Sequence, residues 1–246
     1  MNLDPVSIIA RIREEEAPPG WTLTAAIVLL MLYFIARVVM LAIVSMVLDS
    51  SAVAQGVISA MVTNVAGAAT GVVVLVLIAG MLRRQISGPL MPALRLGRWP
   101  GSVLVLVIVS LGMAILVDFL PLLVQRISLP VALQGMVGAS LPVWLAAVVN
   151  LVIIGPLAEV TLVMGVLYPA LAARMDNLRA VLLAALAYAV IQVFDTPSDL
   201  LLWATAFLAG LYFAGLRGHQ KSTRAAVIAA AMFGVFAVFK ALRLFL

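Results

Sequence analysis

Seven long apolar runs are the feature that most constrains the fold of this chain. A helix needs about 20 predominantly apolar residues to cross roughly 30 Å of membrane hydrocarbon. The runs lack the alternation of barrel strands, so helices are the expected spanning elements. The sequence therefore predicts an all-α polytopic membrane protein with about seven transmembrane helices. The runs are Trp21 to Val47, Gly56 to Leu82, Ser102 to Val124, Ser140 to Ala173, Leu178 to Phe194, Leu200 to Leu216, and Ala225 to the C-terminus.

The composition excludes a soluble domain. Hydrophobic residues make up 65% and charged residues 10% of the 246 positions, whereas soluble domains are about half apolar and about a quarter charged. We expect a single transmembrane domain over residues 21–246, preceded by a cytoplasmic segment, residues 1–20, that lacks the apolar core of a signal peptide. The absence of cysteine excludes disulfides and thiolate metal sites.

The net charge of +5 lies mostly at the ends of the runs, so it indicates topology and a lipid bilayer as partner, with no role for nucleic acid. A cytoplasmic N-terminus places most basic residues inside, which predicts a multi-pass protein of a bacterial inner membrane. The inside set is Arg11, Arg13, Arg83, Arg84, Arg95, Arg98, Arg174, Arg179, Arg217, Lys221 and Arg224; the outside set is Arg126, Lys240 and Arg243.

Three ionisable residues, Arg37, Asp118 and Glu159, fall well inside the runs. An intramembrane charge is costly unless it is paired or hydrated. Arg37 lies 16 residues past Trp21 and Asp118 lies 16 past Ser102, so both reach a similar depth. This spacing predicts a structural Arg37–Asp118 ion pair, and a substrate or ion site built on that pair is the alternative.

Glu159 follows Gly155-Pro156, which interrupts the fourth run. Proline lacks a backbone donor and crowds the preceding turn, so we expect one kinked or broken span. Two interpretations of Glu159 stay open on these grounds: a carboxyl that caps the broken backbone, or a functional group.

The segment from Pro156 to Leu171 reads PLAEVTLVMGVLYPAL. It resembles the first motif of the CPBP family of intramembrane proteases (the CAAX-processing and bacteriocin-processing, or Abi, group), whose pattern is Pro-x-x-Glu-Glu-x-x-x-Arg-Gly-x-Leu-Tyr. The similarity continues through Ala185 to Phe194 and Phe207 to Gly234, so that it covers roughly residues 140–240. The resemblance implies a CPBP-protease-like helical bundle.

The resemblance also implies a site in which a glutamate activates water with the support of histidines, with or without a metal. Glu159 occupies the first glutamate position. The other family positions hold residues without that chemistry: Val160, Met164, Gln192, Ala230 and Gly234. The one histidine, His219, lies in a basic loop, and a typical zinc site takes three protein ligands. We therefore expect no metal and no cofactor, and interpret Glu159 as vestigial in a degenerate pseudoprotease.

Three functions stay open for such a chain. The leading hypothesis is a catalytically inactive subunit, scaffold or assembly factor of a membrane complex. Its support is the small-residue faces Gly67-x-x-x-Gly71 and Gly210-x-x-x-Ala214, which permit close helix approach, although such faces more often serve packing inside the bundle. On this hypothesis Gln192 and Asn150 bond to Glu159 and satisfy it.

The alternatives are an active CPBP-type endopeptidase and a lipid or pigment binder or transporter. The endopeptidase would use Glu159 with Gln192 or Tyr188, and Glu159→Gln would abolish its cleavage of a hydrophobic peptide. A cavity between the helices that holds a ligand would favour the binder or transporter.

Overall fold

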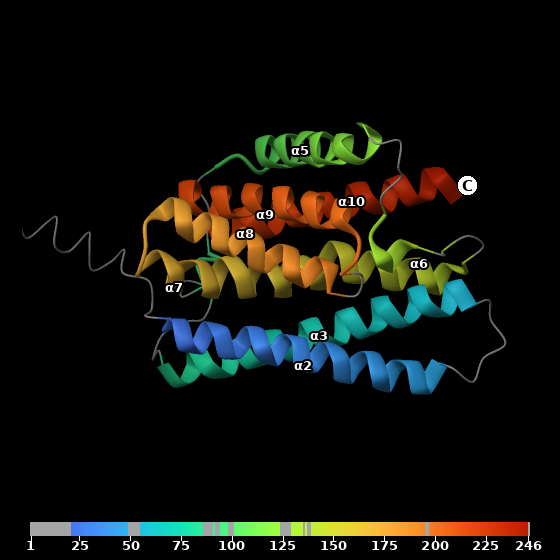
Figure 1. The fold of residues 1–246 in the computed structure, drawn as a ribbon, viewed down its shortest axis with the longest axis horizontal. Helices are drawn as coiled ribbons and strands as arrows, with labels where there is room; N and C mark the ends of the chain where they lie inside the picture. Colours follow the sequence, from blue (N-terminus) through green and yellow to red (C-terminus); the bar gives the residue numbers. More distant parts are fainter. Residues whose placement is uncertain are drawn as a thin grey trace, which may run out of the picture.

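The structure, a computed structural model, describes residues 21–48, 55–85, 91, 94–97, 101–123, 129–134, 136, 139–194 and 197–245. Every regular element in these ranges is helical, with no strand among them (Figure 1). The elements are α2 (Leu23–Leu48), α3 (Gln55–Gln85), α5 (Val103–Leu123), η1 (Val131–Leu133), α6 (Leu141–Val148), η2 (Val149–Ile154), η3 (Pro156–Leu167), α7 (Tyr168–Ala172), α8 (Asn177–Val193), α9 (Leu200–Gln220) and α10 (Thr223–Phe245).

Six helical segments of the described chain are long and apolar enough to cross a bilayer, and one of them is the continuous segment Leu141–Ala172. The seventh, α8, has 17 residues and spans about 25 Å at about 1.5 Å per residue, slightly less than the hydrocarbon core. The predicted all-α polytopic fold is therefore confirmed.

The outer helices expose large apolar side chains. Ile35 of α2 is 59% exposed and Leu104 of α5 is 68% exposed, and similar residues follow along both helices. A helix that is apolar on all sides is typical of a membrane span. These surfaces therefore face lipid.

Neighbours in the bundle follow the order of the chain only in part. Helix α2 packs along α3 at one edge of the molecule, and α5 packs along α10 at the opposite edge (Figure 1). The central helix α10 also contacts α9, η2 and η3. The third span is thus paired with the last span and lies far from the first.

The span that contains Gly155 and Pro156 stays helical through the predicted break. Its hydrogen bonds shift to the wider π pattern on both sides of Gly155: the Gly155 N–H donates to the Asn150 carbonyl, and the Tyr168 N–H donates to the Val163 carbonyl. Pro156 supplies no N–H, which removes an α-helical bond at this point. π-Helical turns are frequent at functional sites, and here they carry Glu159.

Both small-residue faces pack inside the bundle. A Cβ at Gly71 would lie 2.6 Å from the Ile154 side chain, and a Cβ at Gly210 would lie 2.8 Å from the Ala185 carbonyl oxygen. These positions let α3 approach η2 and let α9 approach α8. They are therefore occupied within the chain and offer no face to another subunit.

The described basic residues of the predicted inner set lie near the same end of the bundle, at the end of α3, the α7–α8 turn and the α9–α10 turn (Figure 1). Their placement on the cytoplasmic side stays a prediction. The N-terminal segment, residues 1–20, and most of the loop over residues 86–100 lie outside the described residues, as do Arg98 and Arg126.

Candidate functional site

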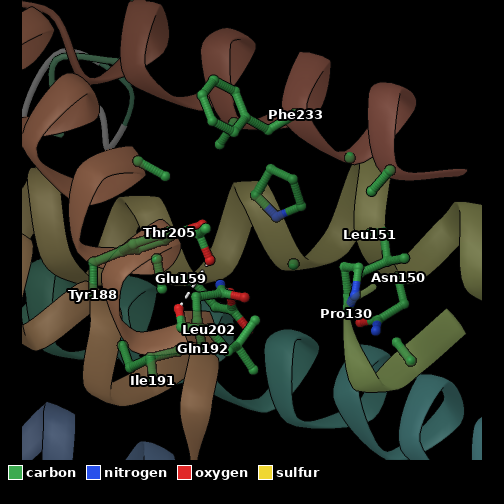
Figure 2. Close-up of a pocket in the computed structure, with 18 of the residues that line it drawn as sticks. Pro130, Asn150, Leu151, Glu159, Tyr188, Ile191, Gln192, Leu202, Thr205 and Phe233 are labelled. Atoms are coloured by element: carbon green, nitrogen blue, oxygen red, sulfur yellow. Dashed lines mark hydrogen bonds between the residues drawn. The ribbon is translucent and has the colours of Figure 1, made fainter. Parts of the chain in front are cut away.

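The Glu159 carboxylate lies where three helices meet. The Tyr33 hydroxyl of α2 donates to Oε1 at 2.9 Å, and the Gln192 side-chain amide of α8 donates to Oε2 at 2.6 Å. Figure 2 shows Glu159 and Gln192 pointing toward one another from η3 and α8. Each carboxylate oxygen therefore accepts a hydrogen bond from a different helix.

Glu159 borders a cavity of about 220 Å³ between the helices. Side chains from α2, α3, α5, η2, η3, α8, α9 and α10 contribute to its wall, and Phe233 of α10 stands across it from Gln192 (Figure 2). The wall combines apolar groups with charged groups of both signs. Its polar side chains are Tyr33, Arg37, Thr63, Asp118, Asn150, Glu159, Tyr188, Gln192, Thr205 and Lys240.

The structure brings four of the motif positions to this cavity and turns two away from it. Glu159, Gln192, Ala230 and Gly234 all line it. Val160 and Met164 are fully buried in the hydrophobic core. The residues that the resemblance aligned on three separate helices thus surround one space.

Gly234 lies at a closed point of the wall. A Cβ at this position would lie 2.1 Å from the carbonyl oxygen of Leu151 and 2.8 Å from its carbonyl carbon. Both are backbone atoms of η2, which cannot rotate out of the way. Helix α10 therefore approaches η2 so closely that position 234 has room only for glycine.

Asp118 has a different partner from the predicted one. It pairs with Lys240 Nζ at 2.5 Å, and the Arg37 guanidinium donates to the Thr63 carbonyl at 3.4 Å. The predicted Arg37–Asp118 pair was wrong in its partner because α5 packs on α10 and lies across the bundle from α2. The prediction that Asp118 needs a cation inside the membrane agrees with the Lys240 contact.

Arg37 and Asn150 belong to a buried polar region beside the cavity. Gly67 leaves room for the guanidinium, since a Cβ there would lie 2.7 Å from Arg37 Nη1. Asn150 donates to Asn64 Oδ1 at 3.2 Å instead of to Glu159, so the predicted Asn150–Glu159 bond is replaced by a bond to α3. Gln192 does form the predicted bond to Glu159.

Sequence reasoning missed Tyr33 and Lys240. Tyr33 lies four residues before Arg37, and residues at this spacing share one face of a helix. That spacing could have indicated that Tyr33 faces the same interior as Arg37. Lys240 was placed in the outside set, although it lies within α10, 17 residues after Thr223.

Met164 occupies the position at which the family motif has an arginine. Its backbone carbonyl is bound by a guanidinium from another helix. Arg217 of α9 is 5% exposed, and its Nε donates to the Met164 carbonyl at 3.1 Å. The same guanidinium lies 5.6 Å from the centroid of the Tyr168 ring. Arg217, which lies on α9, thus donates a hydrogen bond to a carbonyl of the π-helical segment η3.

The residues around Glu159 do not fit a catalytic metal. A catalytic zinc takes three protein ligands, typically imidazole or carboxylate. Glu159 has an amide and a phenol as neighbours, and His219 lies in the last turn of α9. No three His, Cys, Asp or Glu side chains gather in the part of the chain that the structure describes.

These features define a class: a polytopic helical membrane protein with a buried carboxylate on a π-helical span, facing an internal cavity. Residues 140–236, which run from α6 through most of α10, match the family described as type II CAAX prenyl endopeptidase Rce1-like. This part of the chain is thus an Rce1-like region, in agreement with the resemblance of the Glu159 motif. No curated protein and no solved structure matches the chain.

Proposed function

We propose that this protein is a non-hydrolytic Rce1-like membrane protein that uses the Glu159 cavity to bind a ligand. The observation that carries the proposal is the set of groups around the carboxylate. A hydrolase of this design needs groups that move protons near neutral pH, and imidazole is the side chain suited to that task. The cavity presents Gln192, Ala230 and Gly234 at the family positions instead.

The closed position at Gly234 adds independent support. Its Cβ would clash with the Leu151 carbonyl at 2.1 Å, so the backbone itself leaves no room for a functional side chain there. An amide at position 192 donates to Glu159 and cannot exchange a proton with it under ordinary conditions. Two of the donors that hold the carboxylate, the Tyr33 hydroxyl and the Gln192 amide, are neutral, which suits a fixed binding group.

The cavity also favours ligand binding over the scaffold hypothesis. Gly71 and Gly210, from the small-residue faces that suggested a partner subunit, are packed against η2 and α8. A cavity of about 220 Å³ with charged and apolar walls points instead to a ligand held between the helices. Action as a subunit of a membrane complex stays possible only through surfaces other than these faces.

The test combines cleavage with ligand retention in the purified full chain. We expect no Glu159-dependent cleavage of a membrane-spanning or prenylated peptide when the wild type is compared with Glu159→Gln by mass spectrometry. We expect Ala230→Phe, which fills the cavity, to abolish retention of a co-purifying small molecule, while Leu208→Phe on the lipid-facing side retains it. Cleavage that disappears in Glu159→Gln would overturn the proposal.

One contact favours a second candidate, a hydrolase built on a Glu–Gln pair. Glu159 would take a proton from water as the oxygen attacks the scissile carbonyl carbon, and the Gln192 amide, 2.6 Å from Glu159, would stabilise the oxyanion. The proton would then pass from Glu159 to the leaving nitrogen as the C–N bond breaks. This candidate requires cleavage to disappear in both Glu159→Gln and Gln192→Ala.

A further inference from the structure

Four charged side chains face the cavity, two of each sign. Arg37 and Lys240 are cations, and Asp118 and Glu159 are carboxylates, so their formal charges sum to zero. Three of them lie outside the Rce1-like region over residues 140–236. The charge balance of the cavity therefore depends on residues that the family match does not include.

The Asp118–Lys240 pair joins the edge helix to the centre of the bundle. Its side chains are 20% and 16% exposed, and the Nζ–Oδ1 distance is 2.5 Å. On its other side α5 exposes Leu116 and Phe119 to lipid. The pair thus lies where α5 alone separates the polar wall of the cavity from the lipid.

The charge balance selects the net charge of a ligand. A ligand with one net charge would leave an uncompensated charge in a medium of low dielectric constant, which is costly. A headgroup with one positive and one negative charge avoids that cost, because its cation can pair with a carboxylate while its anion pairs with Arg37 or Lys240. The balanced wall therefore favours a zwitterion.

The size and lining of the cavity indicate an amphiphile. Its volume of about 220 Å³ is below the roughly 300–1,000 Å³ of pockets for whole drug-sized ligands, so it holds a headgroup and leaves acyl chains outside. Ala114, Val117 and Phe233 supply apolar wall next to the charges. Such a combination suits the junction between a polar headgroup and its chains.

We propose that the cavity binds the headgroup of a zwitterionic membrane lipid, with the Asp118–Lys240 pair as a recognition element. The lipid's ammonium group approaches Asp118 or Glu159, and its phosphate approaches Lys240 or Arg37. This inference rests on the proposed binding function and adds the class of ligand.

The experiment compares two short-chain lipids on the purified full chain in detergent. Dioctanoyl phosphatidylethanolamine is the zwitterion and dioctanoyl phosphatidylglycerol the anion, and native mass spectrometry or calorimetry gives each Kd. We expect the wild type to prefer the zwitterion at least about tenfold, the effect of about 1.4 kcal/mol. Equal affinity for the two lipids would overturn the proposal.

Charge variants give a readout that simple loss of structure does not imitate. Asp118→Asn leaves one excess positive charge, so the preference should shift by about tenfold or more toward the anionic lipid. Lys240→Gln leaves one excess negative charge and should shift it the other way. The double variant restores neutrality, and its preference should return toward that of the wild type; a ratio that does not move in any variant would refute the assignment.

Ser110→Ala is the matched control on the same helix. Ser110 contacts Tyr212 at 3.0 Å and does not line the cavity, so the variant loosens α5 without changing the charge balance. Its lipid preference should equal that of the wild type. A shift as large as that of Asp118→Asn would assign the effect to the position of α5 and overturn the recognition role.

The free headgroup, glycerophosphoethanolamine, identifies the source of the zwitterion. Binding as tight as that of the short-chain lipid would assign the site to a water-borne zwitterion and overturn the lipid proposal. The proposal that the protein does not hydrolyse peptides is tested by a separate assay, without added lipid. Peptide cleavage by the wild type that disappears in Glu159→Gln would refute it. A protein that cleaves peptide and still shows the charge-dependent lipid preference would refute the first proposal and support the second.

Discussion

The closest backbone approach at any described glycine provides a direct test of the architecture around the cavity. In Gly234→Ala the new methyl group would lie 2.1 Å from the Leu151 carbonyl oxygen, 2.8 Å from its carbonyl carbon and 3.3 Å from Val152 Cα. All three atoms belong to the backbone of η2. The substitution therefore forces α10 away from the π-helical span, because no side chain can rotate to make room.

The cost follows from the size of that displacement. Optimal contacts between non-bonded heavy atoms lie near 3.5–4.0 Å, so the helices must separate by roughly 1.5 Å along the line of the clash. Overpacking a core typically costs about 1–3 kcal/mol, and a clash with backbone falls at the upper end. Alanine regains up to about 1 kcal/mol of helix propensity over glycine. The net loss is about 2 kcal/mol in the free energy of unfolding.

Gly112→Ala on α5 is the matched control, because a Cβ there meets no atom within 4 Å. It should leave the free energy of unfolding unchanged or raise it by up to about 1 kcal/mol. Unfolding titrations with sodium dodecyl sulfate in mixed micelles measure both variants, and we expect Gly234→Ala to be less stable than the control by about 2–3 kcal/mol. Equal midpoints for the two variants would refute the close approach of α10 to η2.

Two further predictions concern the polar contacts of the cavity and use the same titration. Gln192→Leu removes a donor from Glu159 and should lower the free energy of unfolding by about 1–3 kcal/mol, most of which Glu159→Leu should restore in the double variant; additive losses would contradict the contact. Asp118→Ala and Lys240→Ala should each cost about 1–3 kcal/mol, below the roughly 3–5 kcal/mol of a fully buried pair, and should couple in a double-mutant cycle. Coupling of Asp118 to Arg37 instead would revive the pair that the sequence predicted.

The spans could be predicted from the sequence because the bilayer imposes a local requirement. Each run must supply about 20 apolar residues whatever its neighbours are, and the continuous segment Leu141–Ala172 meets it across Gly155 and Pro156. The hydrogen-bond pattern within that span was beyond such reasoning. A proline predicts that one α-helical bond is lost, but it does not determine whether the chain kinks or widens into π turns.

The partner of Asp118 could not be predicted because depth alone does not identify neighbours. Asp118 lies 15 residues into α5 (118 − 103), Arg37 lies 14 into α2 (37 − 23) and Lys240 lies 17 into α10 (240 − 223). All three helices cross in the same direction, so both cations reach nearly the depth of Asp118. The choice between them depends on which helix lies beside α5, and that is a property of the whole bundle.

The Glu159–Gln192 contact, in contrast, could be predicted from the sequence, because both residues belong to motifs of the family that the chain resembles. The two motifs that contain these residues have a fixed separation and lie on η3 and α8, which pack together. The resemblance therefore carried three-dimensional information that periodicity and charge could not. It did not extend to Tyr33, which lies on α2, outside residues 140–236.

The directions of neighbouring residues on η3 determine what a second motif glutamate would do at position 160. Val160 is fully buried in the hydrophobic core, while Glu159 faces the cavity. A second glutamate at position 160 would add no carboxylate to the cavity and would place a charge among apolar side chains, where it is costly without a partner. At position 234 a larger side chain would likewise require α10 to move away from the backbone of η2. The Glu159 carboxylate agrees with the proposed binding cavity, since Tyr33 and Gln192 hold it at the cavity wall with two hydrogen bonds.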